Sequence, residues 1–176
     1  MERVKTAIVG CGSISRIYME SFTQGKFGII ELVACSDLDE ARMQESADAF
    51  GIRAMTLEEI LEDGRIELVV NLTTPAAHYP ISKRCLLAGK HVFSEKMIAV
   101  ELEQGKELVA IANEKGLRLG VAPDLVQVHG RRPGVLEHAP RAHPQVGLAV
   151  VAEHDDLLAA GVGQLEPVAV VDHLDG

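Results

Sequence analysis

A short apolar run that ends in a glycine-rich turn constrains the fold of this chain more than any other feature. Residues Val4–Val9 are mostly aliphatic or β-branched, and residues 10–15 read Gly-Cys-Gly-Ser-Ile-Ser before a helical pattern begins. In a strand–turn–helix of this kind, the first glycine permits a tight turn and the second lets the backbone approach a pyrophosphate. A small last residue lets helix and strand pack closely. The pattern therefore predicts dinucleotide binding, and its alternative is an ordinary turn between a strand and a helix.

Apolar runs alternate with helical patterns along the rest of residues 1–124. Because strands that alternate with helices at this spacing form βαβ units, the sequence predicts an α/β fold, a Rossmann-type doubly wound parallel sheet. Right-handed crossovers place the carboxyl ends of all strands at one edge, where ligands bind in such folds. The expected strands are Val4–Val9, Ile29–Cys35, Glu67–Leu72, His91–Phe93 and Leu117–Ala122, and the expected helices are Ser13–Thr23, Glu40–Phe50, Leu57–Leu61, Ala77–Ala88 and Val100–Lys115.

An acidic residue stands at the end of the second expected strand, 25 residues after Gly12. The Asp37 carboxylate can accept hydrogen bonds from the adenosine ribose hydroxyls, and it would repel the 2′-phosphate of NADP. Two charges ~4 Å apart at an effective dielectric constant near 20 interact by roughly 4 kcal/mol, so NAD is favoured unless a base such as Arg42 intervenes. The alternative is that Asp37, or Asp39 beside it, only caps the helix that begins at Glu40.

Two further segments follow strands at the same expected edge. Residues 73–75 and His78 come after the third long apolar run, so their backbone would face a cofactor in the crevice. The alternative for His78 is a solvated histidine at a helix start. Glu95 and Lys96 follow the short strand that ends at Phe93. A lysine there can donate to a substrate oxygen or stabilise developing negative charge, whereas the alternative is a surface Glu–Lys pair.

Taken in order, these motifs resemble the N-terminal domain of the Gfo/Idh/MocA oxidoreductases. The matching stretches are VGCGSIS, ACSD, NLTTPAAHY, GKHVFSEK and GLRLGVAPD, and they lie within residues 3–124. The resemblance implies a domain that binds NAD or NADP, and an activity that oxidises or reduces sugars, inositols or related small alcohols and ketones. It assigns the pyrophosphate to Gly10, Gly12, Ser13 and Ile14, the ribose to Asp37, the lining of the cofactor to Thr73, Thr74, Pro75 and His78, and a place near the nicotinamide to Glu95.

The same resemblance gives one candidate catalytic residue. Lys96 matches the lysine of the family's Glu-Lys-Pro motif, which helps to position the reacting oxygen. This chain has Met97 where the family usually has proline. Together with Asp37, the resemblance leads us to expect NAD as the cofactor, with NADP second. The substrate of an active chain would be sugar-like, and no metal is expected.

The sequence changes character after Asp124, where the resemblance stops. The 51 residues from Val126 to Gly176 use only ten residue types, and all ten have codons that can begin with G or C. Because a GC-rich gene read out of frame produces such a restriction, we predict that residues 125–176 are an irregular, frameshifted or rearranged C-terminal tail. A genuine low-complexity extension is a second interpretation, and metal binding by the five irregularly spaced histidines of this segment is a third.

Charge and cysteine usage narrow the class of partner. The formal net charge of −9 argues against a nucleic-acid or anionic-membrane partner, which would require a basic face. The three cysteines show no Cys-x-x-Cys spacing, which is typical of free thiols in the cytoplasm, and no apolar run has the length that crosses a membrane. Two functions stay open: an NAD-dependent oxidoreductase, or a cofactor-binding remnant that lacks the family's substrate domain. The oligomeric state is left open.

Overall fold

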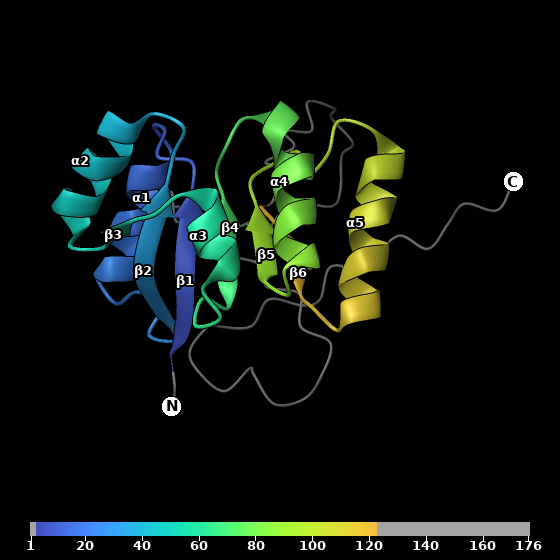
Figure 1. The fold of residues 1–176 in the computed structure, drawn as a ribbon, viewed down its shortest axis with the longest axis horizontal. Coiled ribbons are helices and arrows are strands. Elements are labelled where there is room, and N and C mark those ends of the chain that lie inside the picture. Colours follow the sequence, from blue (N-terminus) through green and yellow to red (C-terminus); the bar gives the residue numbers. More distant parts are fainter. Residues whose placement is uncertain (1–2, 123–176) are drawn as a thin grey trace, which may run out of the picture.

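The computed structural model describes residues 3–122, in which strands and helices alternate without exception (Figure 1). Residues 125–176, predicted as a tail, lie outside the described residues, together with the frameshift, low-complexity and metal-binding hypotheses for them. The strands are β1 (Val4–Val9), β2 (Ile30–Ser36), β3 (Arg53–Ala54), β4 (Leu68–Asn71), β5 (His91–Ser94) and β6 (Leu119–Val121), and the helices are α1 (Ser15–Thr23), α2 (Glu40–Phe50), α3 (Leu57–Glu62), α4 (Pro75–Leu87) and α5 (Leu102–Lys115).

The strands form one parallel sheet in the order β3-β2-β1-β4-β5-β6. The strand order reverses between β1 and β4, which confirms the predicted doubly wound Rossmann arrangement. The register brings the carboxyl ends of four strands to one level, since Val9 pairs with both Ser36 and Asn71, and Asn71 pairs with Ser94. The turns after β1, β2, β4 and β5 therefore start at the same edge of the sheet.

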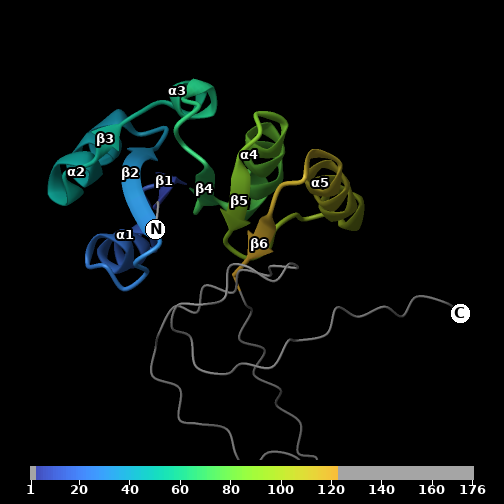
Figure 2. The same cartoon turned by 90° about the horizontal axis from the view of Figure 1, so that it is seen from below.

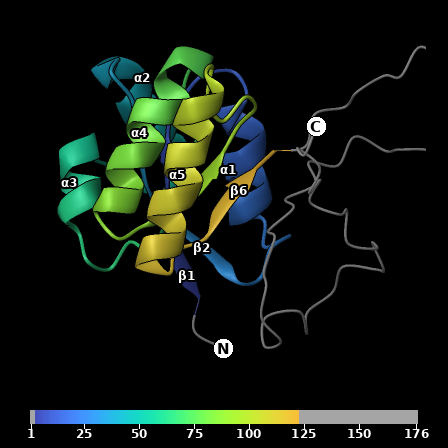
Figure 3. The same ribbon diagram turned by 90° about the vertical axis from the view of Figure 1, so that its right-hand side faces the viewer.

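Helices cover both faces of the sheet, and each face has its own apolar core. Because side chains alternate along a strand, successive residues of β1 point to opposite faces. Ala7 and Val9 pack with side chains of α3, α4 and α5, whereas Ile8 packs with side chains of α1 and α2. Figure 2 shows α3, α4 and α5 on one side of the sheet and α1 on the other, and Figure 3 shows α4 and α5 side by side.

Three local features differ from the prediction. β3 was not expected, because Arg53–Ala54 is a two-residue edge strand that contains no apolar run. Helix α4 begins at Pro75, two residues earlier than expected, since Thr74 takes the N-cap position and proline suits the first helical turn. Helix α1 begins two residues later than expected, at Ser15, so residues 10–14 all belong to the turn that precedes it.

Candidate functional site

The turn after β1 is shaped by two glycines with different surroundings. Gly10 has a φ of +100°, which residues with a side chain rarely adopt, and its amide donates to the Ser36 carbonyl at 2.8 Å. A Cβ atom at Gly10 would lie 2.7 Å from the Leu72 carbonyl carbon, so the turn packs backbone to backbone against the end of β4. A Cβ atom at Gly12 would meet no atom within 4 Å, which leaves this side of the turn open.

The first turn of α1 begins without a side-chain cap. Ser15 is buried, and its hydroxyl donates to the Gly12 carbonyl at 2.6 Å, which ties the turn to the helix. Ser13 and Ile14 are exposed, and no side chain accepts a hydrogen bond at the Ile14 N-cap. The Ser15 and Ile17 amides already donate to the Gly12 and Ile14 carbonyls, so an anion such as a phosphate would meet the amides of the turn that leads into α1.

Asp37 connects the turn after β2 to the glycine turn. Its Oδ2 accepts a hydrogen bond from the Cys11 amide at 2.7 Å, and its Oδ1 accepts one from the Asp39 amide at 2.9 Å. The Arg42 guanidinium lies 3.8 Å from Asp37 Oδ1 and 3.2 Å from Asp39 Oδ2. Asp39 caps α2 by accepting from the Arg42 amide. Of the two aspartates considered as the cap of this helix, Asp39 therefore has that role.

A buried network connects the turn after β4 with the segment after β5. Asn71, at the end of β4, accepts from the Thr73 hydroxyl at 2.6 Å and donates to the His78 carbonyl at 3.0 Å. The His78 ring lies between two backbone oxygens, with Nε2 3.0 Å from the Thr73 carbonyl and Nδ1 2.6 Å from the Met97 carbonyl. His78 is 1% exposed, so the solvated histidine considered from the sequence is wrong. Instead, the ring holds the segment after β5 against the turn after β4.

The Glu95 carboxylate is held by two donors. The Tyr18 hydroxyl, from α1, donates to Oε1 at 2.7 Å, and the Lys96 amide donates to Oε2 at 3.1 Å. Burial and then the neighbouring Glu95 carboxylate raise the pKa of the Tyr18 hydroxyl, so the hydroxyl stays protonated and continues to donate. Lys96 is exposed beside this carboxylate, and the peptide bond between Lys96 and Met97 is cis.

These contacts bring together segments that the sequence placed only at a common edge. The glycine turn contacts Asp37 on one side and the end of β4 on the other, while α1 reaches Glu95 through Tyr18.

The sequence analysis missed Tyr18, because a tyrosine within a helical apolar pattern indicates core packing alone. It also missed Asn71, although a buried asparagine at the end of the run Leu68–Leu72 is a polar interruption that could have been noticed.

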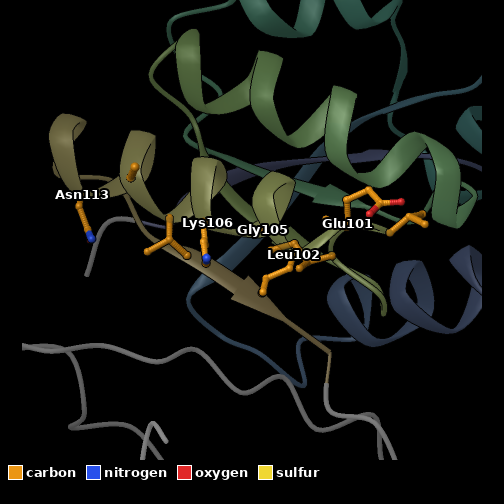
Figure 4. Close-up of a pocket in the computed structure, with 10 residues that line it drawn as sticks. Glu101, Leu102, Gly105, Lys106 and Asn113 are labelled. Carbon is orange, nitrogen blue, oxygen red and sulfur yellow. The ribbon is translucent and has the colours of Figure 1, made fainter. Parts of the chain in front are cut away.

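A hollow of about 750 Å³ lies beside α5. Figure 4 shows that its lining comes from the segment after β5 and from α5, with Leu102, Lys106 and Asn113 among the labelled residues. None of the predicted site residues lines this hollow.

Within residues 3–122, no group of three His, Cys, Asp or Glu side chains is placed to hold a metal ion. In the same part of the chain, every helix falls short of the length and apolar character that crossing a membrane requires.

The chain is similar in sequence to known oxidoreductases. The profile of an oxidoreductase family with an NAD-binding Rossmann fold matches residues 4–123. The inositol 2-dehydrogenase/D-chiro-inositol 3-dehydrogenase of Lactiplantibacillus plantarum is 28% identical over 134 residues, which are 70% of this chain and 38% of that enzyme. The chain spans about a third of the length of the curated relatives that it matches along most of its described residues.

Two solved structures share the fold of the described residues. GenD2 from gentamicin A biosynthesis, in complex with NAD, aligns with a TM-score of 0.65 and 32% identity over 70% of this chain and 37% of its own. Biliverdin reductase from Synechocystis, in complex with biliverdin and NADP+, aligns with a TM-score of 0.63 and 34% identity over 68% of this chain and 37% of its own. Proteins of this fold thus bind either nicotinamide cofactor.

Proposed function

Because this chain belongs to the Gfo/Idh/MocA oxidoreductase family, through an NAD-binding domain at residues 4–123, we propose that it binds NAD along the carboxyl edge of β1, β2, β4 and β5. The observation that carries the proposal is the 2.7 Å hydrogen bond from the Cys11 amide to Asp37, because it sets the glycine turn beside an acidic residue. A dinucleotide needs both at once, a turn for its pyrophosphate and an acceptor for its ribose.

The glycine turn suits a pyrophosphate in shape and in polarity. The open space at Gly12 gives phosphate oxygens access to the backbone, and the exposed residues Ser13 and Ile14, just before α1, bring amide donors to it. A side chain at Gly12 would occupy this space. We therefore assign the pyrophosphate contacts to Gly10, Gly12, Ser13 and Ile14.

Asp37 favours NAD over NADP. Its carboxylate would accept hydrogen bonds from the ribose hydroxyls, and it would repel a 2′-phosphate by roughly 4 kcal/mol at ~4 Å. Arg42 is the base nearest to this position in the sequence, and its charge is already compensated by Asp37 and Asp39. A 2′-phosphate would have to compete with both carboxylates for this guanidinium.

The segment after β5 offers the candidate chemistry. Bound NAD supplies the carbon that accepts or donates a hydride. We propose that Glu95, fixed by Tyr18, lies near the nicotinamide, and that Lys96 donates to the reacting oxygen and stabilises negative charge on it. The proposed substrate is a small sugar-like alcohol or ketone, in keeping with the inositol dehydrogenase relative. The cofactor would be lined on its other side by Thr73, Thr74 and Pro75, and the buried His78 would hold this turn in place from behind.

A second candidate is a cofactor-binding domain without turnover. It is a candidate because the matching family profile, at residues 4–123, describes an NAD-binding domain, which by itself provides a cofactor site. Formation of NADH from NAD with myo-inositol or glucose as the test alcohol separates the two functions.

We also propose a cytoplasmic location, in keeping with three free thiols, and no nucleic-acid partner, in keeping with the net charge of −9.

Calorimetric titration of the full chain with NADH and then with NADPH tests the proposed cofactor. We expect a dissociation constant in the micromolar range for NADH and one at least about tenfold higher for NADPH, because only NADPH brings a 2′-phosphate to Asp37. Circular dichroism of the same sample shows whether the chain is folded. A folded chain that binds neither cofactor would contradict the proposal, and equal affinities would contradict the role of Asp37.

Substitution of Tyr18 by phenylalanine tests whether the α1 tyrosine orients the site. The ring would keep its contacts with Phe22 and Phe93, but Glu95 would lose a hydrogen-bond donor. We therefore expect the free energy of unfolding, measured in urea, to fall by roughly 1–2 kcal/mol. We also expect the affinity for NADH to fall about threefold or more. Tyr79→Phe is the matched control, because its hydroxyl donates to Glu107, between α4 and α5. This control is expected to lose stability without losing NADH affinity. Equal NADH affinities for the two variants would remove Tyr18 from the site.

A further inference from the structure

Two of the three free cysteines belong to the same buried cluster beneath the glycine turn. Cys11 is the middle residue of Gly-Cys-Gly, and Cys35 is the penultimate residue of β2. Both thiols are buried, at 6% and 0% exposure, and both belong to the apolar cluster between the sheet and helices α1 and α2. The Cys11 sulfur also lies 3.5 Å from the carbonyl oxygen of Ser36, the residue directly after Cys35. The turn therefore folds back over the end of β2, and its thiol enters the same buried cluster as the thiol of Cys35.

We propose that Cys11 and Cys35 are a redox pair, which a hydroperoxide converts into a disulfide that ties the glycine turn to β2. The pair itself stands on the positions of the two thiols. Its effect on cofactor binding rests on the proposed function, because it acts on the turn that is assigned to the pyrophosphate.

The two thiols differ in the way that such a reaction requires. The Cys35 thiol lowers the pKa of Cys11, whereas the Cys11 thiol, and then burial, raise the pKa of Cys35. Cys11 is therefore the thiol that ionises first and attacks the oxidant. The Cys35 thiol donates to the Met43 carbonyl oxygen at 3.6 Å, and its hydrogen can turn toward Cys11 when Cys11 becomes a thiolate.

The chemistry balances in two steps, with hydrogen peroxide as the oxidant. The Cys11 thiolate attacks one peroxide oxygen, the O–O bond breaks, hydroxide leaves, and Cys11 becomes a sulfenic acid. The Cys35 sulfur then attacks the Cys11 sulfur, the S–O bond breaks, and the oxygen leaves as water with the Cys35 proton. Two thiols have lost two electrons and the peroxide has gained them. The charge that held up the pKa of Cys35 disappears in the first step, because a sulfenic acid is neutral.

A disulfide at this place would act on both halves of the proposed dinucleotide site. The Cys11 amide donates to Asp37, and the Gly10 amide next to it donates to the Ser36 carbonyl. A bond between the two sulfurs pulls the Cys11 side chain away from the Ser36 carbonyl oxygen and changes the path of the turn. The backbone that faces the pyrophosphate and the carboxylate that faces the ribose would both shift, so oxidation is expected to weaken NAD binding.

Mass mapping of the full chain after hydrogen peroxide treatment tests the pair directly. Trypsin places the three cysteines in separate peptides, residues 6–16, 27–42 and 85–90, once the remaining thiols have been alkylated. We expect a cross-link between the first two peptides that has lost two hydrogen atoms and that dithiothreitol removes. Cys85 is the internal control, because it lies in the core on the other face of the sheet, where burial raises its pKa to about 12. A Cys11 peptide that carries only sulfinic acid, or no modification, would overturn the proposal.

NADH titration before and after oxidation tests the consequence. We expect oxidised chain to bind NADH at least about tenfold more weakly and dithiothreitol to restore binding. In Cys35→Ser no partner thiol is present, so a second peroxide should oxidise the Cys11 sulfenic acid to sulfinic acid and the loss should resist dithiothreitol, whereas Cys85→Ser should behave like the parent chain. A cross-linked chain with unchanged NADH affinity would overturn control of the site by the pair. Reduced chain that binds no NADH would refute the proposed function, while the peptide map would still decide whether the pair forms.

Discussion

Replacement of Gly10 by alanine is expected to lower the free energy of unfolding by roughly 3 kcal/mol or more, a large part of the stability of an ordinary domain. The alanine would have to adopt a φ of +100°, and its Cβ would lie 2.7 Å from the Leu72 carbonyl carbon and oxygen and 2.8 Å from the Thr73 nitrogen. All three are backbone atoms of the neighbouring chain segment, so none of them can rotate away. Urea unfolding followed by far-ultraviolet circular dichroism measures the loss.

Gly12→Ala is the matched control for this experiment, because it places the same methyl group two residues further along the turn. A Cβ there meets no atom within 4 Å, and the backbone does not need a positive φ, so stability should change by less than about 1 kcal/mol. The methyl group would instead occupy the space assigned to the pyrophosphate, and NADH affinity should fall about tenfold or more. A stable Gly10→Ala variant, or a Gly12→Ala variant with full NADH affinity, would contradict this division of roles between the two glycines.

The parallel sheet could be predicted because every strand except β3 corresponds to an apolar run in the sequence. The two-residue β3 leaves none, since Arg53–Ala54 pairs only at the sheet edge and buries little. Helix ends were harder to place where two patterns compete. The sequence analysis placed Pro75 in the turn before a helix that was expected to begin at Ala77. A proline after a threonine cap, however, also suits the first turn of a helix.

The candidate site was predictable where local chain geometry defines the chemistry, and not where distant packing does. Gly10 and Asp37 follow strands, and their neighbourhood results from the sheet order alone. The partner of Tyr18, in contrast, lies 77 residues away in Glu95, and the spacing of residues in α1 carries no sign of it. His78 is a similar case, because its contact with Met97 depends on how the turn after β4 packs on the segment after β5.

We propose that Asp37 gives the site its selectivity between the two nicotinamide cofactors. The side chain is 11% exposed, so its contact with the ribose would be partly shielded from solvent. Two hydrogen bonds between ribose hydroxyls and a carboxylate contribute roughly 1.5–3 kcal/mol each, and repulsion of a 2′-phosphate adds roughly 4 kcal/mol to the preference for NAD. A change at this position therefore acts on both cofactors, in opposite directions.

Substitution of Asp37 by asparagine is expected to lower the ratio of NADH affinity to NADPH affinity by roughly a hundredfold, since about 1.4 kcal/mol corresponds to a factor of ten. The amide oxygen can still accept from the Cys11 amide, so the turn should stay folded while the charge is lost. Calorimetric titration with both cofactors measures the ratio. Glu40→Gln is the matched control, because it removes one exposed negative charge three residues further along, in the first turn of α2, and its ratio should stay within about threefold of the parent. If the two variants change the ratio equally, the preference for NAD arises from the charge of the whole region and not from contact between Asp37 and the ribose.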